Sequence, residues 1–186
     1  MARVGFDLDG VLFDFTSSFR DALTELRNWP RRACPDPTRW DFYEDWGLSQ
    51  KGFLDVCNEA ADAGLLFRRG NLPLGAHSAL KELRAAGHTV HIVTDRSFGS
   101  HPSASQEPTL AWLRENRVDY DTITFTSDKT FVNLDYMLDD RPSNVRALLS
   151  GTACDAYLRA RPWNEQADGL PRVDSVGEYV QKVLTA

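Results

Sequence analysis

Residues 3–15 read Arg-Val-Gly-Phe-Asp-Leu-Asp-Gly-Val-Leu-Phe-Asp-Phe. The first part of this stretch, residues 3–8, is typical of a short β-strand. Two carboxylates, Asp7 and Asp9, stand where the strand ends, and Gly10 permits a turn that brings both to one centre. The stretch therefore predicts a polar site at the end of a sheet.

Further strands and helices are predicted from about residue 76 to the end of the sequence. The other strand patterns lie at residues 89–94, 122–126, 134–138 and 153–158. Helix patterns lie at 76–86, 107–116 and 142–150, and a last one ends near residue 184 with Asp174 as its N-cap. From about residue 76 strands and helices alternate, which is the signature of βαβ units. We therefore predict an α/β protein with a Rossmann-like, mostly parallel five-stranded sheet flanked by helices, whose ligands bind at the C-terminal ends of the strands.

The segment between the first two strands breaks this alternation. Residues 19–26 carry an apolar stripe at helical spacing. Residues 49–63 form a second helix pattern, with Ser49 as its N-cap and Gly64 just past its end. Because no strand is predicted between these helices, we expect a small helical cap at residues 16–73, inserted after the first strand and lying over the site. Residues 1–15 and 74–186 would then form the α/β core domain.

Composition narrows the classes of protein to which the chain can belong. Of its 186 residues, 42% are hydrophobic and 26% charged, as in ordinary soluble proteins. No apolar stretch approaches the roughly 18 residues that span a bilayer, and no signal-peptide pattern is present, so we expect a cytoplasmic protein without a membrane partner. A net charge of −6 argues against binding a nucleic-acid polymer. The three cysteines and four histidines lack the spacing of a zinc site.

Polar residues follow four of the predicted strands. Beyond the first strand, these residues are Thr94, Lys129, Asp139 and Asp140. Because buried charge is costly unless it is paired or bound to a metal, the repetition indicates one site assembled from several strand ends. Carboxylates without histidines suit Mg²⁺, a hard cation that prefers oxygen ligands, with Asp7 and Asp139 as the ligands.

This set of residues fits covalent phosphoryl transfer. With a metal neutralising charge, the Asp7 carboxylate can attack phosphorus and form an aspartyl-phosphate. Asp9 would protonate the leaving oxygen as general acid and later activate water as general base. Thr94 is expected to hydrogen-bond a phosphoryl oxygen, and Lys129 to offset the negative charge of nucleophile and phosphate.

Four stretches resemble, in the right order, the four motifs of the haloacid dehalogenase (HAD) superfamily. They are Asp7-Leu-Asp9-Gly-Val, Ile-Val-Thr94, Ser-Asp-Lys129-Thr and Leu-Asp139-Asp140. The resemblance covers nearly the whole chain and implies that superfamily's helical cap. It also implies metal ligation by the Asp7 side chain, the Asp9 backbone carbonyl and Asp139, with Asp140 nearby in a supporting role. The dehalogenase branch lacks a carboxylate at the position of Asp9, so a phosphatase is expected.

A narrower likeness points to a substrate class. Residues 9–15, 128–132 and 138–140 are similar to the 5′(3′)-deoxyribonucleotidase branch of that superfamily. This likeness implies a small phosphoester substrate, a (deoxy)nucleoside monophosphate, with Phe15 and Trp40 in contact with the base. Other aromatic residues of the cap, Phe42, Trp46 and Phe67, are expected mainly to form its core.

Two positions depart from the pattern of that branch. Ser127 stands where an arginine is usual, and Asp95 follows Thr94 where a small hydroxyl residue is common. We take Asp95 and Arg96 as further substrate contacts, with Arg96 supplying a phosphate contact in place of the missing arginine. The turn at residues 161–164, after the last strand, is interpreted as packed around its tryptophan, with a place at the border of the pocket as the less favoured alternative.

Two other functions remain open at this point. A HAD phosphatase for another small phosphoester, such as a sugar phosphate, would share every catalytic residue and differ in the lining of its cap. A phospho-acceptor signalling domain also combines acidic residues, a threonine and a lysine around Mg²⁺, but its acidic pair and its phosphorylated aspartate lie on different strands. That order disfavours the signalling domain here. A homodimer is compatible with the sequence.

Overall fold

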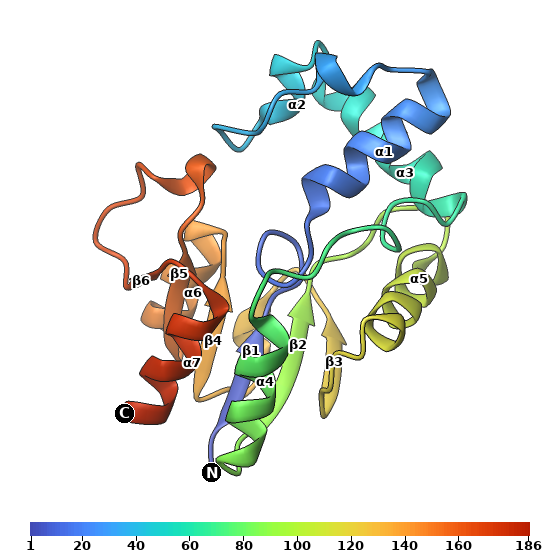
Figure 1. Cartoon of the computed structure of the whole chain (residues 1–186). Helices are drawn as coiled ribbons and strands as arrows, with labels where there is room; N and C mark the ends of the chain where they lie inside the picture. Colours follow the sequence, from blue (N-terminus) through green and yellow to red (C-terminus); the bar gives the residue numbers. More distant parts are fainter.

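All 186 residues are described by the computed structural model, in which six parallel strands form one sheet (Figure 1). The strands are β1 (Arg3–Phe6), β2 (Thr89–Thr94), β3 (Thr122–Phe125), β4 (Tyr136–Asp139), β5 (Asp155–Arg159) and β6 (Arg172–Val173). The predicted α/β class and parallel sheet are confirmed. The predicted number of five strands is wrong, because β6 has two residues and is too short to produce a sequence pattern.

The order of the strands places β1 near the centre of the sheet. The sheet runs β3-β2-β1-β4-β5-β6, so the chain passes from β1 outward to β3 and then crosses back to β4 on the other side of β1. In the register, Phe6 of β1 pairs with Ile92 of β2 and Leu138 of β4. The C-terminal ends of β1 and β4 therefore meet at a topological switch point, where open α/β sheets bind their ligands.

Helices cover both faces of the sheet. On one face, α4 (Ala76–Ala85), α5 (Pro102–Glu115) and α7 (Val176–Thr185) share the largest apolar cluster with the strands. The other face carries α6 (Pro142–Gly151), whose Val145 and Leu148 pack against Met137. On this second face a Cβ at Gly5 would lie 2.5 Å from the Leu134 side chain and 2.6 Å from Met137 Sδ. Close packing on the α6 face thus requires glycine in the central strand.

Several element boundaries differ from the predicted ones. β1 ends at Phe6 and β4 spans residues 136–139, each shifted or shortened by about two residues. Helix α5 begins at Pro102, whereas the sequence predicted a start near residue 107, because Pro108 was interpreted as lying in the first turn. The helix continues through Pro108, and its Trp112 and Leu113 pack in the largest apolar cluster. The N-cap of α7 is Ser175 and not Asp174, and it accepts a hydrogen bond from Glu178 N at 3.0 Å.

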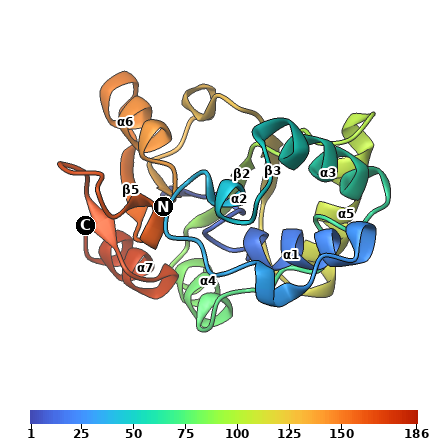
Figure 2. The same ribbon diagram turned by 90° about the horizontal axis from the view of Figure 1, so that it is seen from above.

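Three helices stand above the C-terminal edge of the sheet. They are α1 (Phe15–Arg27), α2 (Phe42–Asp45) and α3 (Gln50–Asp62) (Figures 1 and 2). They enclose an apolar cluster of their own, which includes Phe19, Trp46, Cys57 and Phe67. Trp46 and Phe67 are therefore core residues, as predicted. The boundaries of the helical cap, residues 16 and 73, stay a prediction. None of the helices combines the length and apolar character needed to span a bilayer.

Candidate active site

Three buried carboxylates gather at the C-terminal ends of β1 and β4. One carboxylate oxygen from each of Asp7, Asp139 and Asp140 lies within 4.8 Å of the others. Pairing between the two strands continues past the end of β1, because Asp7 N donates to Leu138 O at 3.0 Å. This backbone contact brings residues that are about 130 positions apart in the sequence into one cluster.

A tight turn after β1 carries Asp9 back toward the same cluster. The carbonyl of Leu8 accepts hydrogen bonds from the backbone N–H groups of residues 11, 12 and 13. Gly10 has φ +74°, and a Cβ at this position would overlap the Asp140 carboxylate. Only glycine fits both conditions, since it tolerates positive φ and leaves room for the carboxylate.

Lys129 forms ion pairs with two of the carboxylates, Asp7 and Asp139. Its Nζ lies 2.9 Å from Asp7 Oδ2 and 2.6 Å from Asp139 Oδ2, and 2% of its side chain is exposed. Burial lowers the pKa of Lys129, but the charges of Asp139 and Asp7 outweigh this effect, so the pKa is raised above its ordinary value. Lys129 is therefore a charged ammonium group inside the site.

The cluster holds more negative than positive charge. Three ionised carboxylates against one ammonium group would leave a net charge of −2. Burial, followed by repulsion from Asp139 and Asp9, raises the pKa of Asp7 to about 7 although Lys129 opposes the change. Burial and the charges of Asp139 and Asp7 raise the pKa of Asp140 well above its usual range. Such a set of buried oxygen donors, without histidine or cysteine, is suited to a hard divalent cation.

The two adjacent carboxylates of β4 differ in what they face. Asp139 is fully buried, and both its oxygens are engaged: Oδ2 accepts from Lys129 and from Asn144 Nδ2 at 3.0 Å, and Oδ1 accepts from Arg141 N at 2.8 Å. Asp140 lines the cavity and has one hydrogen-bonded oxygen, Oδ2, so its other oxygen is free. Asp139, expected as the direct ligand, is thus set back from the cavity, whereas Asp140, expected in a supporting role, lines it.

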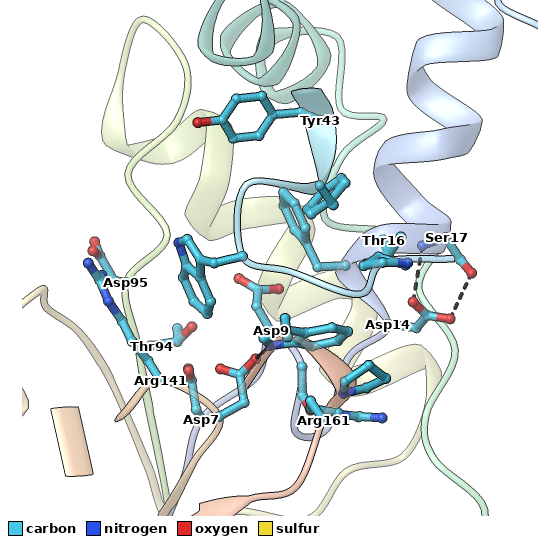
Figure 3. Close-up of a pocket in the computed structure, with 18 of the residues that line it drawn as sticks. Asp7, Asp9, Asp14, Thr16, Ser17, Tyr43, Thr94, Asp95, Arg141 and Arg161 are labelled. Atoms are coloured by element: carbon cyan, nitrogen blue, oxygen red, sulfur yellow. Dashed lines mark hydrogen bonds between the residues drawn. The ribbon is translucent and has the colours of Figure 1, made fainter. Parts of the chain in front are cut away.

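Thr94 presents a buried hydroxyl to the cavity. The residue is fully buried at the end of β2, and its Oγ1 has no hydrogen-bond partner within the protein. Because buried polar groups almost always have a partner, this hydroxyl is available to a ligand. Figure 3 shows Thr94 beside Asp7 and Asp9 in the lower part of the cavity.

Arg96 lies behind Asp9 and does not line the cavity. Its NH2 group is 2.7 Å from Asp9 Oδ1, and its Nε donates to Asp9 Oδ2 at 3.2 Å. The guanidinium is fully buried between the rings of Phe13 and Phe67, at 4.3 and 4.5 Å from their centroids, and also donates to Thr109. Arg96, expected as a phosphate contact, is thus paired with Asp9 away from the cavity lining, as a buried charge requires a partner.

A cavity of about 700 Å³ extends from the carboxylates up to the helices α1–α3. This volume suits a ligand of nucleotide size. Its walls include Phe15, Trp40 and Asp95, all expected as substrate contacts, together with Phe42 and Tyr43. Trp40 is 47% exposed and faces Arg141, whose guanidinium carbon lies 5.5 Å from its ring centroid. Phe15 also packs on Phe19, so it serves both the cavity and the apolar cluster above it.

Two parts of the site escaped the sequence analysis. Arg141 and Asn144 line the cavity from the start of α6, directly after the acidic pair. Trp163, in the turn after β5, also lines the cavity and donates from Nε1 to Asp140 Oδ2 at 2.9 Å. The interpretation of this turn as packed around a buried tryptophan is therefore wrong. The position of this turn could have revealed it, because the turn follows β5, which pairs with β4.

Comparison with known proteins identifies a family for this geometry. The model of the family described as "5' nucleotidase, deoxy (Pyrimidine), cytosolic type C protein" matches residues 1–186. A protein of Chlorobaculum tepidum named "Putative 5'(3')-deoxyribonucleotidase" is 31% identical over 179 residues, covering 89% of this chain and 88% of the relative. One of the same name from Bordetella bronchiseptica is 27% identical over 181 residues, covering 90% and 88%.

Solved structures show the same fold at lower identity. A HAD phosphatase from Thermococcus onnurineus has a TM-score of 0.56 at 16% identity, with 99% of this chain and 98% of that chain covered. A D,D-heptose 1,7-bisphosphate phosphatase from B. bronchiseptica, solved with magnesium and phosphate, has a TM-score of 0.56 at 12% identity, with 100% and 99% covered. With its motifs, fold and relatives in agreement, the chain belongs to the cytosolic type C 5′-nucleotidase family and is a HAD phosphatase near the deoxyribonucleotidase branch.

Proposed function

We propose that this phosphatase is Mg²⁺-dependent and hydrolyses (deoxy)nucleoside monophosphates through an aspartyl-phosphate on Asp7. The observation that carries the proposal is one continuous cavity. Its lower part is formed by Asp7, Thr94 and Lys129, and its upper walls are aromatic, with Phe15 and Trp40 among them. The names of the family and of the curated relatives support the same substrate class.

The polar residues divide the chemistry among them. We assign Asp7 the role of nucleophile; it lines the cavity, and its Oδ1 and Oδ2 accept hydrogen bonds from Leu8 N and Lys129. Lys129 offsets the charge of the attacked phosphate, and the free Thr94 hydroxyl donates to a phosphoryl oxygen. Asp9, on the cavity wall, protonates the leaving oxygen and then activates water. When bound, Mg²⁺ would neutralise the charge shared by nucleophile and phosphate.

For the metal we propose a ligand set drawn from the acidic residues that line the cavity. The Asp7 carboxylate, the Asp9 backbone carbonyl and the free oxygen of Asp140 would hold Mg²⁺. Asp139 would act indirectly, because it is fully buried and does not line the cavity, whereas Asp7 and Asp140 do.

Substitution of the two β4 carboxylates distinguishes their roles. Asp140→Asn removes a charged ligand and is expected to weaken Mg²⁺ binding by more than roughly 100-fold, whereas Asp139→Asn, as a change in a supporting residue, should weaken it by roughly 10- to 100-fold. Calorimetric titration of each purified variant with Mg²⁺ measures both values. A larger loss in Asp139→Asn than in Asp140→Asn would restore the ranking expected from the sequence.

A screen for phosphate release tests the proposed substrates. With Mg²⁺, the protein should release phosphate from deoxynucleoside monophosphates faster than from sugar phosphates such as ribose 5-phosphate. Trp40→Ala should raise KM for a nucleotide and leave KM for ribose 5-phosphate unchanged, because only the nucleotide carries a base for the ring to contact. Inactivity on every nucleotide, or a preference for sugar phosphates that Trp40→Ala does not alter, would favour the sugar-phosphate alternative.

A further inference from the structure

The four-residue turn Arg161–Asn164, which follows β5, contacts both loops that carry carboxylates of the site. Its Trp163 donates from Nε1 to Asp140 Oδ2 at 2.9 Å, and Asn164 Nδ2 donates to the Asp140 carbonyl at 2.8 Å. Arg161 reaches the other loop and donates from Nε to the carbonyl of Gly10 at 2.6 Å. Figure 3 shows Arg161 below Asp9. One short segment thus holds residues that follow β1 and residues that end β4.

The turn is itself fixed to the sheet. Asn164 is buried, and its Oδ1 accepts from Arg161 N at 3.0 Å and from Arg172 NH2 at 2.9 Å. Its Nδ2 also donates to Arg159 O at 2.8 Å, and Pro162 restricts the backbone at the start of the short helix η3 (Pro162–Asn164). Its anchors therefore lie in β5 and β6, so the turn belongs to the rigid sheet and not to the helices above the cavity.

The indole N–H determines which oxygen of Asp140 remains free. A carboxylate can rotate about its side-chain bonds and offer either oxygen. Here Trp163 occupies Oδ2, and Gly10 packs so closely on the same oxygen that a Cβ would overlap it. An indole nitrogen is a donor without acceptor capacity, so it can hold a carboxylate oxygen but cannot itself bind a cation. The remaining oxygen of Asp140 is left to face the cavity.

We infer that the turn Arg161–Asn164 positions the metal-binding loops, and that Trp163 is the positioning residue for Asp140. The inference rests on the proposed function, because it takes Asp140 as a ligand of Mg²⁺. Hydrogen-bond partners behind a ligand fix its orientation, and their loss commonly weakens metal binding. A tryptophan in the wall of a cavity is more often regarded as a substrate contact; the hydrogen bond to Asp140 assigns it a second role.

Trp163→Phe tests this role because it deletes the N–H and keeps most of the ring. Calorimetric titration without substrate is expected to show Mg²⁺ binding weakened by roughly 10- to 100-fold. The matched control is Trp40→Phe, which alters another tryptophan of the cavity wall that has no contact with a carboxylate of the cluster, and its Mg²⁺ affinity should stay within twofold of the original. At saturating Mg²⁺, Trp163→Phe should recover its kcat with KM unchanged.

Other outcomes separate the inference from the proposed function. Arg161→Met removes the bond to Gly10 and should also weaken Mg²⁺ binding, which keeps the test available if Trp163→Phe does not fold. Unchanged affinity in the folded variants would overturn the inference, as would a raised KM as the sole effect of Trp163→Phe, since that pattern describes a substrate wall. If the original protein itself fails to bind Mg²⁺, the metal dependence in the proposed function fails instead.

Discussion

Asp7→Asn is expected to lower kcat for phosphate release by about ten-thousand-fold or more, the scale on which enzymes lose activity with their nucleophile. The side chain lines the cavity 2.9 Å from Lys129, and as the proposed nucleophile its carboxylate would attack the phosphorus. An amide of the same shape cannot attack phosphorus and ligates Mg²⁺ poorly. Steady-state assays with a deoxynucleoside monophosphate measure the loss, and acid quenching of labelled substrate should trap no phosphoenzyme.

The stability of the metal-free protein provides the control for this variant. Burial raises the pKa of Asp7 to about 7, so the ionised side chain destabilises the metal-free fold above that pH. At pH 8 with a chelator, Asp7→Asn should therefore unfold at a higher temperature than the original. This gain should shrink as the pH falls through 7 and be absent below about 4, where the carboxyl is protonated in both folded and unfolded states. Near-normal turnover in a variant that shows this gain would rule out Asp7 as nucleophile.

The part of the site that follows local rules could be predicted from the sequence. Asp7 directly follows β1, Thr94 ends β2 and Lys129 lies in the segment after β3, and parallel strands bring their C-terminal ends to one edge of a sheet. Once the strands were recognised, no knowledge of side-chain packing was needed to group these residues. Part of the aromatic wall of the cavity could be predicted for the same reason, because Phe15 is the first residue of α1, the helix that starts at this edge of the sheet.

What could not be predicted depends on partners distant in the sequence. Arg96 and Asp9 are 87 positions apart, and no local pattern shows that the guanidinium turns toward a carboxylate instead of a substrate. The surroundings of Asp139 and Asp140 depend on the alternation of side chains along β4. Asp139 points to the same side of the sheet as Met137, so it enters the packed layer under α6. Asp140 reaches the cavity. Pro108 concealed the first half of α5, because tertiary packing overrode a local helix-breaking signal.

The contact between Arg96 and Asp9 leads to the second large expected effect. Both oxygens of Asp9 are held by one buried guanidinium, while 27% of the Asp9 side chain remains exposed to the cavity. If Asp9 is the general acid and base, Asp9→Asn should lower kcat by roughly 100- to 10,000-fold. Arg96→Met keeps an unbranched side chain between Phe13 and Phe67 but frees Asp9, and should lower kcat by about 100-fold, because a displacement of about 1 Å can cost that much.

The double variant determines whether Arg96 acts through Asp9. If the guanidinium serves only to position this carboxylate, adding Arg96→Met to Asp9→Asn should cause no further loss, whereas independent effects would multiply. Thr109→Val is the matched control, since it removes another partner of the same guanidinium and leaves Asp9 held. With p-nitrophenyl phosphate, whose phenolate leaves without a proton, both single variants should lose less than with a nucleotide. Multiplying losses, or equal losses on the two substrates, would show that Arg96 supports the fold and not the acid.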